Sequence, residues 1–136
     1  MKAQTAERLL VLMLRFFGAT GLLATIFVLI PFSWMDAIHA KLGLGSMPPG
    51  PIVQYLARSL SAFYAIVSGV MLVASFDVAR YRPILIYLSL AVVMLGCALF
   101  FIDLTAGLPL AWIALEGPPT ALVGLLCLWL LRKIAV

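Results

Sequence analysis

Two opposite charges inside apolar segments are the residues of this sequence best placed for chemistry. Arg58 and Glu116 each lie about 9 to 11 Å from one end of the apolar segment that holds them, at 1.5 Å per helical residue. Ionisable side chains within a membrane are costly and usually pair with one another. We therefore expect a buried ion pair between Arg58 and Glu116.

Other polar residues fall at or near the same level of the chain: Asp103, Tyr55, Tyr64, Asp36 and His39. Three interpretations of this cluster stay open. It is a buried ion-pair network that determines helix register, a site for a lipid headgroup or small polar ligand, or an acid/base centre. The sequence favours the structural interpretation. In the third, Asp36, His39 or Glu116 would transfer the proton.

Motifs of catalysis and of cofactor or metal binding are missing from the sequence. His39 is the only histidine, so two imidazoles cannot ligate a haem, and there is no Cys/His set for zinc. Cys97 and Cys127 fall at different depths of their segments and form no CxxC pair. No nucleotide loop, zinc-protease motif or nucleophile elbow occurs. We expect no catalytic residue, cofactor, bound metal or nucleic-acid partner.

The elements that position these residues are four long apolar stretches. Each can cross a hydrocarbon core of about 30 Å as a helix. Hydrophobic residues make up 65% of the sequence and the mean hydropathy is +1.21. We predict an all-α integral-membrane bundle of four transmembrane helices, a single domain over 1–136, with spans at about 9–31, 55–76, 83–102 and 109–131.

Basic residues lie mainly beside one end of each predicted span. Lys2 and Arg8 precede the first, Arg80 and Arg82 join the second to the third, and Arg132 and Lys133 follow the fourth, whereas Lys41 is the main basic residue of the opposite loops. Positive residues favour the cytoplasmic side. We expect both termini in the cytoplasm and a bacterial inner membrane as the location.

The first outer connection contains a short helical pattern over about 34–42. At 100° per residue, Trp34, Met35, Ile38 and Leu42 share one face, with Asp36 and His39 opposite. This arrangement predicts a helix that lies in the headgroup plane.

A proline pair interrupts the last apolar stretch at Glu116-Gly117-Pro118-Pro119. Proline removes a backbone donor and clashes with the preceding turn. The stretch is then either one kinked or broken spanning helix, or a short outer helix over 109–115 followed by a new helix from Pro118. We favour the spanning helix, because 118–131 alone covers only about 21 Å.

Small and polar residues form matching stripes on the first two spans. Small residues allow membrane helices to approach closely. We therefore predict a contact between these helices; a polar pathway would need more charge. The stripes comprise Arg58, Ser61, Ala65, Ser68, Gly69 and Ser75 on the second span, and Gly18, Gly21 and Thr25 on the first.

Several short motifs between Trp34 and Pro118 carry a resemblance. They are Trp34-Met35-Asp36-Ala37-Ile38-His39, Gly43-Leu44-Gly45, Tyr55-Leu56-Ala57-Arg58-Ser59, Asp77 with Arg80-Tyr81-Arg82-Pro83, Gly107-Leu108-Pro109 and Glu116-Gly117-Pro118. This stretch resembles a family of uncharacterised small bacterial membrane proteins. The resemblance implies a fold and a compartment but no activity. The four-helix layout alone is similar to DoxX-like membrane proteins.

These features together favour a non-enzymatic accessory or scaffold subunit that packs against another membrane protein or itself. The alternative is a protein that binds or transports a lipid or small amphiphile through the polar cluster at Arg58 and Glu116. In either case membrane lipids are partners.

Overall fold

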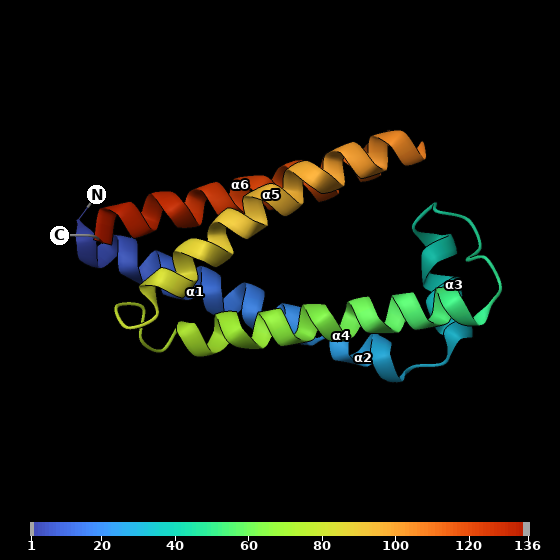
Figure 1. Ribbon diagram of the computed structural model, residues 1–136, viewed down its shortest axis with the longest axis horizontal. Coiled ribbons are helices and arrows are strands. Elements are labelled where there is room, and N and C mark those ends of the chain that lie inside the picture. Colours follow the sequence, from blue (N-terminus) through green and yellow to red (C-terminus); the bar gives the residue numbers. More distant parts are fainter. Residues whose placement is uncertain (1, 135–136) are drawn as a thin grey trace. The chain divides into compact units, whose positions relative to one another are not determined.

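All regular secondary structure over residues 2–134, the part of the chain that the computed structural model describes, is helical (Figure 1), so the predicted all-α class is confirmed. The helices are α1 (Ala3–Leu22), α2 (Ala24–Leu29), α3 (Phe32–Lys41), α4 (Pro51–Ala74), α5 (Arg82–Ala106) and α6 (Leu110–Ile134). Four spans are long and apolar enough to cross a membrane, and α1 and α2 together make the first, Ala3–Leu29. The protein is therefore a multi-pass membrane protein.

The bounds of the spans differ from those that hydropathy alone indicated, and the first runs over Ala3–Leu29 rather than 9–31. The second begins at Pro51 rather than near residue 55, because proline suits the first turn of a helix, where its missing N–H would have no partner anyway. The third continues through Ala106. Gly107 then takes a left-handed conformation (φ 70°), and the N–H of Leu108 donates to the carbonyl oxygen of Asp103 at 3.1 Å, which ends the helix.

Proline does not divide the last span. Helix α6 is continuous from Leu110 to Ile134 and contains both Pro118 and Pro119, so the alternative with two separate helices is wrong. The Thr120 hydroxyl donates to the Glu116 carbonyl oxygen at 2.6 Å. The prolines remove the N–H donors for the carbonyl oxygens of Ala114 and Leu115, so the Thr120 bond lies one residue beyond the backbone groups that proline affects.

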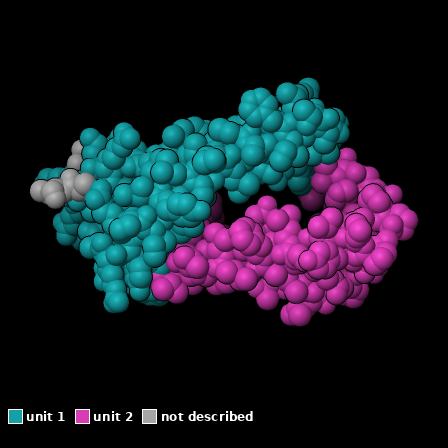
Figure 2. All heavy atoms as spheres, in the orientation of Figure 1, with its two compact units in different colours: residues 1–13, 74–136 teal, residues 14–73 magenta. Residues whose placement is uncertain are grey.

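Two compact units make up the chain (Figure 2). Unit 1 contains residues 1–13 and 74–136, and so holds the start of α1 with α5 and α6. Unit 2 contains residues 14–73, with the rest of α1 and helices α2, α3 and α4.

Within unit 1, α5 and α6 lie side by side (Figure 1) and approach closely at three glycines. A Cβ atom added at Gly117 would lie 2.7 Å from the backbone nitrogen of Phe100, and one at Gly124 would lie 2.7 Å from the Ser89 carbonyl oxygen. Gly96 lies in the same way against Gly117 and Ala121. The two backbones are thus in contact, as small residues permit in membranes.

A seven-residue repeat of polar and small residues runs along the α5 side of this seam. Arg82, Ser89, Gly96 and Asp103 follow at intervals of seven, which keeps them on one face of a helix that packs along a partner. Ser89 and Asp103 are buried, and the Ser89 hydroxyl donates to the Leu85 carbonyl oxygen at 2.7 Å. The two charged members therefore lie at opposite ends of the α5–α6 seam.

In unit 2, the predicted contact between the first two spans is present. A Cβ atom added at Gly18 would lie 3.0 Å from the Leu72 Cβ atom and from the Ser68 carbonyl oxygen. Gly21 lies against the Ser68 side chain. The small stripes on α1 and α4 serve to bring these helices together.

Candidate functional site

The residues predicted to form a site divide between the two units. Asp103 and Glu116 belong to unit 1, whereas Asp36, His39, Tyr55, Arg58 and Tyr64 belong to unit 2. The ion pair between Arg58 and Glu116 would join the units, and it stays a prediction.

Arg58 contacts the backbone between α2 and α3. Its Nη2 atom donates to the carbonyl oxygen of Ile30 at 3.3 Å, where α2 ends before Pro31. A cation is favourable at the C-terminus of a helix, where carbonyl groups lack helical partners. The buried Nε–H of Arg58 has no hydrogen-bond partner among the described residues.

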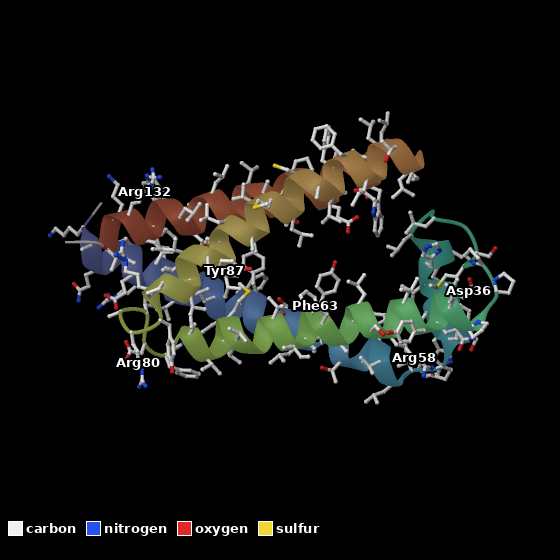
Figure 3. All side chains as sticks on the ribbon, in the orientation of Figure 1. Asp36, Arg58, Phe63, Arg80, Tyr87 and Arg132 are labelled. Carbon is white, nitrogen blue, oxygen red and sulfur yellow. The ribbon has the colours of Figure 1, made fainter. Side chains whose placement is uncertain are left out.

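Asp36 and His39 hold the loop that follows α3. The backbone N–H of Met47 donates to Asp36 Oδ1 at 2.6 Å, and His39 Nδ1 lies 2.8 Å from the Gly45 carbonyl oxygen. Figure 3 shows Asp36 and Arg58 towards the same end of unit 2. The polar face of α3 thus orders residues 42–50.

The two tyrosines lie on α4 and differ in exposure. Tyr55 is 68% exposed and Tyr64 is 37% exposed. Tyr55 therefore lies on the outer surface of its helix, with an apolar ring and a polar hydroxyl, as is usual for tyrosine near a membrane interface.

Asp103 and Glu116 lie towards the end of the α5–α6 seam that is near Gly107. Gly117 lies against Phe100, which places the two acidic residues within about one helical turn along the seam. Glu116 is half-buried, and Trp112 lies four residues before it on the same helix. Asp103 is only 3% exposed, and its Oδ2 atom has no hydrogen-bond partner among the described residues.

Two functional contacts were not foreseen from the sequence. Arg82, interpreted as a topology signal, donates from Nη2 to the Leu131 carbonyl oxygen at 3.2 Å and so joins α5 to the end of α6. The spacing of seven between Arg82, Ser89, Gly96 and Asp103 is the signal that indicates this role. Trp112 is the other residue, and its separation of four from Glu116 places both on one face of α6.

No protein-family model, curated protein or solved structure matches this chain.

Proposed function

We propose that this protein is a non-enzymatic accessory or scaffold subunit of a bacterial inner membrane, which packs against another membrane protein or a second copy of itself. The observation that carries the proposal is an exposed apolar stripe along α4, comprising Ile52, Leu56, Phe63, Ile66, Val70 and Val73. Ser59, also exposed, completes it.

The stripe can be covered by one helical partner along its length. Its members follow at alternating intervals of four and three residues, which places them on one continuous face of α4. A lipid-facing surface needs only to be apolar. Ser59 adds a hydroxyl in the middle of the stripe, and hydroxyl groups commonly form hydrogen bonds between membrane helices.

The use of polar side chains supports a structural role as well. Asp36, His39, Arg58 and Arg82 each contact a backbone group of their own unit. These contacts stabilise helix ends and one loop, and they leave the apolar surface as the main surface offered to other molecules.

The proposal is tested with a photo-reactive amino acid at Ile66, in the stripe. The matched control is the same residue at Phe101, which is on α5 and has similar exposure, 62% against 66% for Ile66. Illumination in membranes should give one discrete cross-linked species from Ile66 and none from Phe101. A protein that migrates as a lone monomer after gentle solubilisation, with no co-purifying chain and no cross-link, contradicts the proposal.

The proposed orientation places both termini in the cytoplasm and the 43–50 loop outside. A reporter fused after Val136 should be active only if it works in the cytoplasm, and one inserted near Ser46 only if it works outside. The basic residues at 80–82 and 132–133 support this orientation through the preference of positive charge for the cytoplasmic side. Opposite signals from the two reporters would reverse it.

The second candidate function is binding or transport of a lipid or small amphiphile at the outer polar residues. The unpartnered Nε–H of Arg58 favours it, because a guanidinium retains donors that suit a phosphate oxygen. Native mass spectrometry should then find a phospholipid retained by the wild type and lost in Arg58→Gln. Arg132→Gln, in unit 1 and in the last turn of α6, serves as the control. Equal retention by both variants contradicts this candidate.

A further inference from the structure

We propose that Asp103 and Glu116 form a binding site for one small monovalent cation, a proton or an alkali-metal ion, at the outer end of the α5–α6 seam. The proposal goes beyond the scaffold function and does not depend on it. The shared chemistry is a single positive charge on carboxylate oxygens inside the membrane.

The first step of the argument is the environment of Asp103. Its side chain is 3% exposed and Oδ2 has no hydrogen-bond partner among residues 2–134. A buried carboxylate without a partner is among the most costly groups in a membrane protein, so such groups are neutralised, paired or bound to a cation.

The second step is the charge distribution around Asp103. Glu116 adds a second carboxyl group to the same region. Asp103 also lies in the last turn of α5, where the helix macrodipole is negative and further disfavours an anion. Within unit 1, the other charged residues of these helices, Arg82, Arg132 and Lys133, lie at the opposite end of the seam, about 30 Å away along α5.

The third step concerns the charge of the ligand. Within the described part of the chain, no three His, Cys, Asp or Glu side chains gather in a metal-binding group. Calcium takes six to eight oxygen ligands and magnesium retains an ordered octahedral shell, so two carboxyl groups suit a monovalent ion better.

The roles of the two carboxyl groups differ. Asp103 is enclosed and has an unpartnered oxygen, so it is the group that holds the cation. Glu116 is partly exposed, and Trp112 lies four residues before it on the same helix. Glu116 therefore forms the solvent-facing part of the site. An ion pair between Glu116 and Arg58, if formed, would still leave Asp103 without a cation.

The test uses the full chain in liposomes and dicyclohexylcarbodiimide, which adds to protonated carboxyl groups in apolar surroundings. The carboxyl O–H adds across one C=N bond, and the adduct rearranges to a stable N-acylurea that peptide mass spectrometry locates. The chain supplies its own controls, because Glu7, Asp36 and Asp77 are its only other acidic residues and lie outside the α5–α6 seam. Labelling is measured across a pH series with sodium or with choline as the only added cation.

We expect Asp103 to be labelled several-fold more than any control carboxyl group in choline, and Asp103→Asn to abolish that label. Labelling that sodium leaves unchanged identifies the cation as a proton. Labelling that sodium suppresses identifies it as an alkali-metal ion. Labelling of Asp36 and Asp77 equal to that of Asp103 overturns the proposal.

Asp103→Asn provides a second measurement on the same protein. It keeps the shape of the side chain and removes the charge, so its melting temperature in detergent should equal or exceed that of the wild type and should no longer depend on pH or sodium through this site. A marked loss of stability, together with no label on wild-type Asp103, shows that the carboxylate is ionised and satisfied within the protein, and overturns the proposal.

Discussion

The two ends of the α5–α6 seam carry opposite charges in the same seven-residue repeat, and the structure treats them differently. Arg82 donates to the carbonyl oxygen of Leu131, near the end of α6, where a cation meets the negative end of the helix macrodipole. Asp103 lies in the last turn of its own helix, where an anion is disfavoured, and its Oδ2 atom has no partner among the described residues. The positive charge of Arg82 is satisfied by a carbonyl group at the end of α6. The negative charge of Asp103 requires an additional cation.

This contrast separates structural polar residues from candidate binding residues. A guanidinium carries five donors on a long chain, so Arg82 makes its contact although its Nε–H has no partner among the described residues. Asp103 has a short side chain and two acceptor oxygens in an enclosed position. The length of the side chain and its donors or acceptors therefore decide which charged group can form hydrogen bonds with the backbone alone.

The largest effect is expected from leaving Arg58 or Glu116 without the opposite charge. If Arg58 and Glu116 pair in a low dielectric, Arg58→Ala or Glu116→Ala should each lower the free energy of unfolding by about 3–5 kcal/mol. The double substitution should lose clearly less than the sum, because no charge is left alone. Thermal unfolding in detergent measures this, with Arg132→Ala as a control. Losses that simply add would show that the residues do not pair.

The next effect is expected from separating the two helices. Gly117→Leu should lower the free energy of unfolding by about 3 kcal/mol, because the added side chain meets the α5 backbone and the helices must move apart. Gly69→Ala is the matched control, since a Cβ atom there would lie 3.9 Å from Leu22 Cδ2 in ordinary contact. Equal melting temperatures for the two variants would argue against a close seam.

A direct comparison of the two ends follows from neutral substitutions. Arg82→Met removes a charged donor and should lower the free energy of unfolding by about 1.5–3 kcal/mol. Asp103→Asn, which keeps its shape, should cause no loss. Both are measured by thermal unfolding in the same detergent. If Asp103→Asn destabilises the protein as much as Arg82→Met, the two charged residues stabilise the protein equally and the proposed contrast between them is wrong.

The smallest effect is expected in the loop that follows α3. Asp36→Ala removes the acceptor for the Met47 N–H and should cost about 1 kcal/mol of local stability. Hydrogen exchange of residues 43–50 should become faster, while exchange in α5 and α6 should not change. Ser33→Ala, an exposed change on the same helix, should leave the loop unaffected.

The four spans were predictable from the sequence, because runs of apolar residues long enough to span a bilayer must satisfy their backbone groups internally as helices, but the division of the first span into α1 and α2 was not predicted. Residues 34–42 were predicted as an amphipathic helix, and α3 covers Phe32–Lys41. The end of α5 was placed at 102, four residues early, because hydropathy falls at Asp103 although the helix continues until Gly107 allows the turn.

The tertiary structure decided which polar residues contact one another. Depth along a helix gave Arg58 and Glu116 equal levels, but depth does not define the direction in which a side chain points or the backbone group that it reaches. Contacts such as Arg82 with Leu131 and Asp36 with Met47 depend on how helix ends and loops pack. The burial of Asp103 likewise arises only when α6 packs against α5 through its glycines, because the same residue on an isolated helix would remain exposed.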